Sequence, residues 1–202
     1  MSGPFVCVID DDPGVAALSA QVLSEAGFEV RTFLSADEFL KNAPQTREPD
    51  CVVSDLRMPG IGGGELLRHL KQAGAVASVV IVTAHADVRT TVRLMEDGAA
   101  SLLEKPFDPP ELVEVVRRAV ENTVKRRAEV QTVGEIHRRL AQLPADSQAV
   151  LECILAGLPN KAIVSRLDIS PRTLDRRKQL IMTTLQVGSV PELIALVTRA
   201  RQ

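Results

Sequence analysis

The sequence contains no tryptophan and no tyrosine, and its five aromatic residues are all phenylalanines that lie before position 108. Proteins that bind single-stranded nucleic acid by stacking bases need aromatic rings, so this class of binding protein is disfavoured. No run of about 18 apolar residues is present, and we therefore expect no membrane-spanning helix and no membrane partner. No basic segment precedes the first apolar run, which predicts that there is no secretory signal.

Cysteine is also scarce. The three cysteines, Cys7, Cys51 and Cys153, are scattered along the chain, and two of them lie inside apolar runs. An odd number of scattered cysteines indicates neither a disulfide framework nor a metal-ligand cluster. We therefore expect reduced cysteines in the core of a cytoplasmic protein.

The composition that is present is that of an ordinary globular protein, since 45% of the 202 residues are hydrophobic and 25% are charged. The length suits two domains of roughly 100 residues each. The net charge of −2 conceals a difference, because residues 135–202 contain ten Lys and Arg against six Asp and Glu, and residues 1–134 contain fourteen against twenty. A basic C-terminal part weakly favours nucleic-acid binding there, although two ordinary domains of different charge explain the same pattern.

In the first 120 residues, short apolar runs alternate with amphipathic stretches. Five such repeats predict alternating strands and helices, which specify a doubly wound α/β domain around a five-stranded parallel sheet. The expected strands are Phe5–Ile9, Phe28–Thr32, Cys51–Ser54, Val79–Val82 and Leu102–Leu103. The expected helices are Pro13–Ala26, Ala36–Asn42, Gly64–Gln72, Val88–Asp97 and a fifth that begins at Glu111.

The helical pattern continues from Glu111 to about Gln142. Its later part carries one apolar stripe, formed by Val130, Val133, Ile136, Leu140 and Leu143. The stripe predicts a linker helix that either pairs with a copy of itself or packs on the C-terminal part. Four short amphipathic segments follow, without a strand pattern. We therefore predict an α/β domain at residues 1–122, a linker helix at 123–142 and a second, all-α domain at 143–202.

Polar residues follow four of the five expected strands. They are Asp10 and Asp11 after the first strand, Asp55 after the third, Thr83 after the fourth and Lys105 after the fifth. The carboxyl ends of parallel strands meet at one edge of the sheet, where doubly wound proteins place their chemistry. Three carboxylates repel one another unless a cation lies among them, and oxygen ligands of this kind suit Mg²⁺.

Such a cluster favours phosphoryl transfer. The Lys105 ammonium and the Thr83 hydroxyl offer a positive charge and a hydrogen-bond donor to a phosphoryl group, which is most of what this reaction requires. Asp55 faces the acidic pair from the neighbouring strand and is the candidate nucleophile, which would form an acyl phosphate. Each of these residues alone has an ordinary structural role as a cap, turn or loop residue, so the prediction depends on their joint occurrence.

Four segments together resemble the signatures of response-regulator receiver domains, in the order and spacing of that family. They are VIDDDPGV, VVSDLRMPG, IVTAHAD and LLEKPF, and they cover residues 1 to about 120. The resemblance implies that Asp55 receives a phosphoryl group from a sensor histidine kinase. It also implies a Mg²⁺ site whose ligands are Asp10, Asp11, Asp55 and the backbone carbonyl of Arg57.

The same resemblance implies roles for the residues around the phosphate. Thr83 would move toward the phosphate and Lys105 would pair with it, while the small Ala84 would leave it accessible. Pro106 implies a cis peptide bond after Lys105.

Leu102 departs from the family pattern, because receivers usually carry Tyr or Phe there, whose ring turns inward with the threonine on phosphorylation. The switch in this chain then depends on Thr83 and the surface of the fourth helix and fifth strand alone, or its coupling is weakened. We predict that the phosphate-driven change centres on the helix Val88–Asp97.

The segment from Gly157 to Leu185 predicts a helix-turn-helix motif. Residues 168–170 form the turn, and Ser170 followed by Pro171 is typical of a helix start. At 100° per residue, Leu174, Ile181 and Leu185 share the face directed at the core. The opposite face carries Arg172, Asp175, Arg176, Gln179 and Thr183. Arg and Gln can bind base edges in the major groove, although a solvated helix face has a similar composition.

Residues 143–200 resemble the output domain of the LuxR/NarL family, and the segments GLPNKAI and LDISPRTL are similar to its FixJ subgroup. The resemblance implies promoter DNA as a partner, with Lys161, Arg172 and Thr173 contacting it chiefly at phosphates. Together with the exposed face of the second helix, the predicted DNA-binding residues are Lys161, Arg172, Thr173, Asp175, Arg176, Arg177 and Gln179.

The output domain also departs from its family. Residues 143–147 replace the usual Thr/Ser-x-Arg-Glu element, Arg177 stands where the family has His, and Thr184 stands where it has Lys. These changes imply an altered sequence preference or a loss of DNA binding.

The favoured hypothesis is a transcription regulator that is switched by phosphorylation, dimerises and binds DNA. The first alternative is a response regulator whose helical domain acts on a protein or RNA partner. The second is an enzyme, such as a phosphatase similar to the haloacid dehalogenase family. Those hydrolases carry a second Asp where Arg57 stands, so we expect no turnover of external substrates. The receiver would catalyse only its own phosphorylation and slow dephosphorylation, which His85 either tunes or leaves unchanged.

Overall fold

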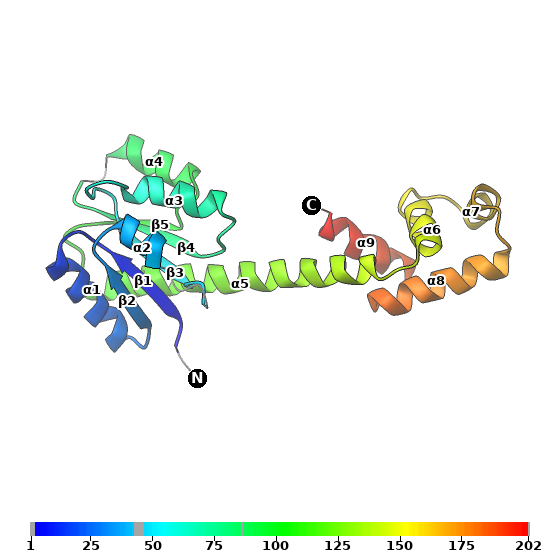
Figure 1. Ribbon diagram of the computed structural model, residues 1–202, viewed down its shortest axis with the longest axis horizontal. Coiled ribbons are helices and arrows are strands. Elements are labelled where there is room, and N and C mark those ends of the chain that lie inside the picture. Colours follow the sequence, from blue (N-terminus) through cyan, green and yellow to red (C-terminus); the bar gives the residue numbers. More distant parts are fainter. Residues whose placement is uncertain (1–2, 43–46, 86, 202) are drawn as a thin grey trace. The chain divides into compact units, whose positions relative to one another are not determined.

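The computed structural model describes residues 3–42, 47–85 and 87–201. The chain divides into two compact units, one that ends at Arg127 and one that begins at Ala128. The first unit combines a sheet with helices, and the second is helical (Figure 1).

The first unit contains a parallel sheet with the strand order β2-β1-β3-β4-β5. Its strands are β1 (Phe5–Ile9), β2 (Glu29–Phe33), β3 (Cys51–Asp55), β4 (Ser78–Thr83) and β5 (Ser101–Glu104). Its helices are α1 (Pro13–Glu25), α2 (Ala36–Asn42), α3 (Gly63–Gln72), α4 (Val88–Glu96) and α5 (Pro109–Ala141), which extends past the end of the unit. The predicted doubly wound fold is confirmed, and the predicted bounds of these elements are off by only one or two residues.

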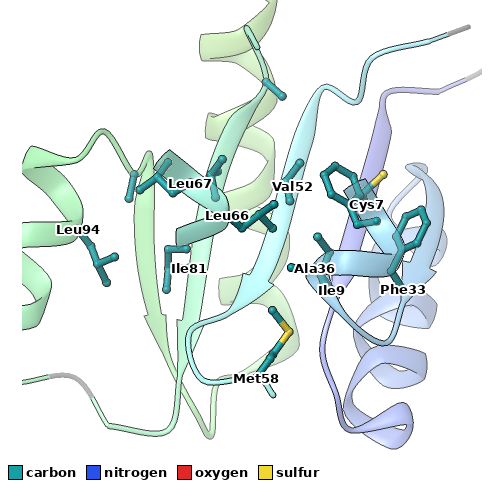
Figure 2. Packing of buried hydrophobic residues seen from close by; sticks show 14 of the residues in the cluster. Cys7, Ile9, Phe33, Ala36, Val52, Met58, Leu66, Leu67, Ile81 and Leu94 are labelled. Carbon is teal, nitrogen blue, oxygen red and sulfur yellow. The ribbon is translucent and has the colours of Figure 1, made fainter. Parts of the chain in front are cut away.

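Helices cover both faces of the sheet, and this explains the continuous apolar runs of the central strands. Every residue of β1, β3 and β4 is buried. On one face, side chains of α2, α3 and α4 pack on strand residues such as Cys7, Val52 and Ile81, and Figure 2 shows Leu66 and Leu94 in this cluster. A second cluster, on the opposite face, joins the sheet to α1 and α5.

Cys7 and Cys51 lie in these two clusters and Cys153 lies in the core of the second unit, and all three are buried and free as predicted. Burial raises the pKa of Cys7 to about 12, against a smaller opposing effect of Arg31. Burial also raises the pKa of Cys51, with smaller contributions from Cys7 and Asp50. The thiols of Cys7 and Cys51 are therefore protonated at neutral pH.

The topology places a crevice at the carboxyl ends of β1 and β3. From β1 the chain crosses to β2 on one side, and from β3 it continues to β4 on the other, so the order of the strands reverses between β1 and β3. Ile9 is paired with Ser54 in the parallel register. The residues that follow this pair, Asp10 and Asp55, therefore lie side by side.

The end of the first unit is held by polar contacts between α5 and the amino ends of β3 and β4, away from the carboxyl ends of the strands. The backbone N–H of Ser78 donates to Thr123 Oγ1 at 2.8 Å, and Arg126 donates to Ser78 Oγ at 2.6 Å. Arg127 forms an ion pair with the buried carboxylate of Asp50. The predicted linker helix is thus the continuation of α5, which is one helix from Pro109 to Ala141.

The second unit contains α6 (Ala145–Leu155), α7 (Asn160–Leu167), α8 (Pro171–Leu185) and α9 (Val190–Ala200). Their shared core includes Leu143 and, at its edge, Leu140. Leu140 and Leu143 of the predicted stripe therefore pack on the C-terminal part. Val130, at the start of the stripe, is 59% exposed.

Helices α7 and α8 form the predicted helix-turn-helix. Asp168 ends α7 in the left-handed conformation with φ 49°. Ser170 begins α8, and its Oγ accepts a hydrogen bond from the backbone N–H of Thr173 at 3.1 Å. This contact satisfies one of the free N–H groups at the helix start.

Within the described residues, no single helix is long and apolar enough to cross a membrane. The helices α8 and α9 reach that length and hydropathy only as a pair bent by 55°. Their apolar residues Leu174, Ile181 and Val197 are buried in the core of the second unit.

Candidate functional site

The predicted carboxylate cluster forms at the carboxyl edge of the sheet. Lys105 Nζ donates to Asp10 Oδ2 and to Asp55 Oδ1, each at 2.6 Å. Asp10 is 4% exposed and Asp55 is 7% exposed. Two nearly buried carboxylates on neighbouring strands therefore share one cation, which offsets their mutual repulsion.

Two opposing effects act on the pKa of Lys105. Partial burial disfavours the charged ammonium and by itself lowers the pKa. The hydrogen bonds from the ammonium to Asp10 and Asp55, together with the charges of these carboxylates, outweigh burial and raise the pKa of Lys105 above its ordinary value. Lys105 is therefore charged at neutral pH. The Lys105–Pro106 peptide bond is cis, as the resemblance implied.

Backbone donors bind the remaining oxygens of the two buried carboxylates. The N–H of Arg57 donates to Asp55 Oδ2 at 2.5 Å, and the N–H of Asp12 donates to Asp10 Oδ1 at 3.0 Å. Asp12 itself caps α1 by accepting from the N–H groups of Gly14 and Val15. This role was not among the sequence predictions, although an Asp directly before Pro13 is a common helix start.

A cavity of about 310 Å³ opens over this cluster. It is lined by Asp10, Asp11, Asp12, Val15, Asp55, Arg57, Thr83, Ala84, His85 and Lys105. All of the predicted site residues of the first unit are therefore in this lining except Leu102. Leu102 is partly buried and packs against the hydrophobic cluster of α2, α3 and α4.

The Thr83 side chain is bound within its own turn. Its hydroxyl accepts a hydrogen bond from the backbone N–H of His85 and donates one to the carbonyl oxygen of His85, each at 3.2 Å. Thr83 is 2% exposed, whereas Ala84 and His85 are exposed at the mouth of the cavity. A ligand in the cavity would compete with this local hydrogen bonding for the hydroxyl.

Gly63 positions Asp55, a role that was not predicted from the sequence. A Cβ atom at Gly63 would lie 2.4 Å from the backbone oxygen of Asp55 and 3.1 Å from Ser54 Oγ. The start of α3 can therefore approach the end of β3 this closely only with glycine at this position. The glycine run at residues 62–64 is a signal of such an approach, and a Cβ atom at Gly62 would also lie too close to the backbone, at 2.8 Å from the oxygen of Leu56.

The donor set fits a hard cation. Among the described residues, no three His, Cys, Asp or Glu side chains already converge on one point. Asp10 and Asp55 nevertheless bring two carboxylates together, and Asp11 and Arg57 line the same cavity. Oxygen donors with space for water and a phosphate are the ligands that Mg²⁺ prefers.

The second candidate site is the outer face of α8. Leu174, Ile181 and Leu185 are buried, as predicted for the inner face. The outer face is exposed and carries Arg172, Asp175, Arg176, Gln179 and Thr183. Lys161 is exposed on α7, and Thr173 lies partly buried beside Ser170, with 2.8 Å between their hydroxyl oxygens.

A groove of about 660 Å³ runs beside this face. It is lined by Pro144, Asp146, Ser147, Thr173, Arg176, Arg177, Gln179, Leu180 and Thr183. Arg177 differs from the other predicted DNA-binding residues because it forms an ion pair with Asp146 of α6 at 2.5 Å. Leu180 is 42% exposed in the groove.

An α/β unit with an Asp–Lys–Asp cluster at its sheet edge, followed by a helix-turn-helix unit, defines the class of response regulators. The family model of the response regulator receiver domain matches residues 6–117. The model of bacterial regulatory proteins of the luxR family matches residues 145–197. The chain therefore belongs to the response-regulator family and carries a LuxR-type output domain.

Within this family the chain is FixJ-like. It is 38% identical to the transcriptional regulatory protein FixJ of Azorhizobium caulinodans over 96% of this chain and 92% of the relative. It is 37% identical to FixJ of Rhizobium meliloti over 97% and 96% of the two chains. Among solved structures, it matches full-length FixJ from B. japonicum with a TM-score of 0.61 and 36% identity, covering 100% of this chain and 98% of that one. It also matches the response regulator StyR with a TM-score of 0.82 and 34% identity, covering 98% and 99%.

Proposed function

We propose that this FixJ-like regulator is phosphorylated on Asp55 by a sensor histidine kinase and then acts on promoter DNA through α8. The observation that carries the proposal is the cluster in which Lys105 contacts both Asp10 and Asp55 below an open cavity. The buried, unpaired cysteines support the reducing cytoplasm as its place of action.

The chemical step is a phosphoryl transfer between side chains. A carboxylate oxygen of Asp55 attacks the phosphorus of a phosphohistidine on the kinase, so that an O–P bond forms while the P–N bond breaks. The histidine nitrogen leaves with the electrons of that bond and takes up a proton. Lys105 holds Asp55 Oδ1 before the transfer, and its ammonium is placed to bind an oxygen of the new phosphoryl group.

The ligands of the proposed Mg²⁺ are Asp10, Asp11, Asp55 and the backbone carbonyl of Arg57, all residues that line the cavity. When bound, the cation supplies positive charge to the phosphoryl oxygens. The protein contributes the buried placement of the carboxylates and the fixed orientation of Asp55, which the Arg57 N–H and Gly63 maintain.

We expect the receiver to act on no external substrate. Arg57 lines the cavity two residues after Asp55, and its guanidinium stays protonated at neutral pH and cannot serve as a general acid. The proposed activity is therefore limited to phosphorylation of Asp55 and slow hydrolysis of the phosphate, at a site where His85 lies at the cavity mouth.

The phosphate is proposed to act through Thr83 and α4. Movement of the Thr83 hydroxyl toward the phosphate breaks its contacts with the His85 backbone. In the sequence, His85 precedes the start of α4 by three residues. The outer face of α4 carries Val88, Val92 and Met95, which are 80%, 50% and 46% exposed. Their spacing forms one apolar stripe, and we propose that it joins two copies of the chain on phosphorylation.

Light scattering tests the dimer. The molar mass of the full chain is expected to double when a stable phosphoryl analogue and Mg²⁺ are added, and to stay unchanged in an Asp55→Asn variant. An unchanged monomer in the wild-type protein would rule out the dimer, while phosphorylation of Asp55 would still be measured separately.

Mass spectrometry tests the phosphoacceptor. After treatment with acetyl phosphate and Mg²⁺, the wild-type chain is expected to gain one phosphoryl group and the Asp55→Asn variant none. Asp168→Asn is a matched control in the turn of the second unit, where Asn tolerates the left-handed conformation equally well. Retention of the phosphoryl group by Asp55→Asn would disprove the assignment.

A salt titration tests DNA binding by the full chain. Arg172 and Arg176 are exposed on α8, and the double variant Arg172→Ala, Arg176→Ala is expected to bind duplex DNA more weakly. Its slope of log affinity against log salt should flatten by about 0.9 for each DNA phosphate that the variant no longer neutralises. If the folded double variant binds DNA as the wild type does, Arg172 and Arg176 do not contact the DNA. If the wild-type chain itself binds no DNA, the alternative of a protein or RNA partner is favoured.

A further inference from the structure

One of the arginines on the proposed DNA-binding helix is already paired within the protein. Arg177 Nη2 lies 2.5 Å from Asp146 Oδ2. The Arg177 side chain is 21% exposed and the Asp146 side chain is 53% exposed. Both residues line the groove beside α8, together with Arg176 and Gln179.

The neighbouring arginines differ. Within the part of the chain that the structure describes, no ion pair joins Arg172 or Arg176 to a carboxylate, and both are exposed. The three arginines therefore divide into two that face solvent and one that is turned toward α6. A carboxylate resembles a phosphate in charge and geometry as a partner for an arginine, and the Asp146 carboxylate already binds the guanidinium of Arg177.

We propose that Asp146 acts as an internal substitute for a DNA phosphate and withholds Arg177 from the nucleic acid. This inference rests on the proposed function of α8 in DNA binding. Phosphate contacts supply most of the affinity for any DNA sequence but carry no sequence information. Withholding one such contact lowers the affinity for DNA of any sequence. A larger share of the binding free energy then comes from Arg176 and Gln179, the residues expected to bind base edges.

The exposure of the pair supports this role over a purely structural one. Asp146 lies in the first turn of α6 and is more than half exposed, and ion pairs with such exposure contribute little to folding. The domain core beneath the pair consists of apolar residues such as Val150 and Ile181. Removing the Asp146 charge is therefore expected to free Arg177 without unfolding the domain.

The test measures binding of the full chain to mixed-sequence duplex DNA over a range of salt concentrations. Asp146→Asn is expected to raise the affinity several-fold at low salt and to steepen the slope of log affinity against log salt by about 0.9, the value for one additional neutralised phosphate. Asp146→Ala, which removes the acceptor oxygen as well, should give the same change. Asp146→Glu keeps the charge and should keep the wild-type slope.

Glu152→Gln is the matched control. Glu152 also lies on α6 and pairs at 2.5 Å with Arg201, the residue that follows α9, but it does not line the groove. The same loss of one negative charge is therefore expected to leave the slope unchanged. Circular dichroism confirms that each variant is folded before its binding is compared.

Variants of the arginine complete the experiment. Arg177→Gln alone should leave the wild-type slope unchanged, and Arg177→Gln combined with Asp146→Asn should remove the added slope. A flatter slope for Arg177→Gln alone, or an unchanged slope for both Asp146→Asn and Asp146→Ala, overturns the inference while DNA binding by the wild type still stands. If the wild-type chain binds no DNA, the proposed DNA-binding function fails and the inference fails with it.

Discussion

At the scale of single residues, one shared ammonium explains how two carboxylates lie together at the sheet edge. Asp10 and Asp55 are almost fully buried, and each accepts a hydrogen bond from Lys105. A buried carboxylate without a partner costs several kcal/mol. The lysine that is proposed to bind the phosphate therefore also stabilises the fold before phosphorylation.

Replacing this lysine is expected to destabilise the first unit. Breaking a fully buried ion pair costs about 3–5 kcal/mol. Because the Lys105 side chain is 21% exposed and the cavity admits water, we expect Lys105→Met to lower the free energy of unfolding by about 1–2 kcal/mol. Urea denaturation in buffer with a chelator measures this loss. Lys71→Met, an exposed lysine of α3, should change stability by less than about 0.5 kcal/mol.

The loss of stability caused by Lys105→Met is expected to depend on pH. The pKa of Lys105 is higher in the folded state than in the unfolded state, where it is near 10.5. The stabilisation by Lys105 is therefore complete below the unfolded pKa. It is lost as the pH rises through the pKa of the folded state. The stability difference between wild type and Lys105→Met should be constant at neutral pH and shrink only at strongly alkaline pH. A difference that disappears near neutrality would contradict the shared-ammonium account.

A second residue-scale prediction concerns Gly63. The Cβ atom of Gly63→Ala would meet the backbone oxygen of Asp55 at 2.4 Å, so β3 or α3 must shift. We expect a loss of about 1–3 kcal/mol, as for other overpacked sites, together with slower phosphorylation by acetyl phosphate. The added Cβ atom of the neighbouring Gly64→Ala meets only side-chain ends, those of Leu94 at 3.1 Å and Leu56 at 3.8 Å. Normal stability and phosphorylation of Gly63→Ala would show that this close approach is not required.

At the scale of elements, the ends of the helices decide where functional groups lie. Asp12 caps α1 directly after Asp10 and Asp11, and Ser170 caps α8 two residues before Arg172. Each cap satisfies backbone N–H groups that have no partner within the helix. The first turn of each helix is thereby held in place beside a candidate site.

Removal of the α8 cap should destabilise the second unit. The Oγ of Ser170 accepts from the N–H of Thr173, and loss of such a cap costs about 1 kcal/mol. We expect Ser170→Ala to lower the unfolding free energy of the second unit by this amount and to weaken DNA binding through fraying near Arg172. Ser165→Ala, at an exposed position inside α7, should change neither. Thermal denaturation and hydrogen exchange across α8 measure both effects.

Replacing the glycine inside the long helix α5 is expected to increase stability. Gly134 lies in the interior of α5, and a Cβ atom there would meet nothing within 4 Å. Gly134→Ala is therefore expected to stabilise this part of the helix by about 0.5–1 kcal/mol. Hydrogen exchange should show slower exchange of the amides around position 134, and faster exchange would indicate that a helical conformation is not favoured there.

At the scale of the whole molecule, each unit has its own hydrophobic core. Two clusters lie on the faces of the sheet in the first unit, and the third joins α6, α7, α8 and α9 in the second. None of these described clusters mixes residues of the two units. A ligand of one unit is therefore expected to stabilise that unit alone.

Calorimetry of the full chain tests this independence. We expect two unfolding transitions, of which Mg²⁺ raises only that of the first unit, by about 1.4 kcal/mol when its concentration is ten times the Kd. Asp11→Asn should reduce this gain, whereas Ser170→Ala should lower only the transition of the second unit. A single transition that responds to both changes would show that the two units unfold together.

Much of the fold was predictable because the relevant signals are local. The apolar runs of β1, β3 and β4 are long and continuous, and the amphipathic pattern of each helix repeats within a few residues. The strand ends therefore located Asp10, Asp55, Thr83 and Lys105 at one edge. Leu102 was named only because of the resemblance to receivers, and its side chain packs against the hydrophobic cluster of the first unit instead of lining the cavity.

The sequence by itself determined the order of the elements, the division into an α/β part and a helical part, and the set of polar residues at the sheet edge, because periodicity and strand ends depend on near neighbours. Only the tertiary structure decided that Lys105 joins Asp10 to Asp55, that Gly63 must stay small, and that Arg177 turns to Asp146. These contacts join side chains on different elements, and their distances depend on packing that no local pattern contains.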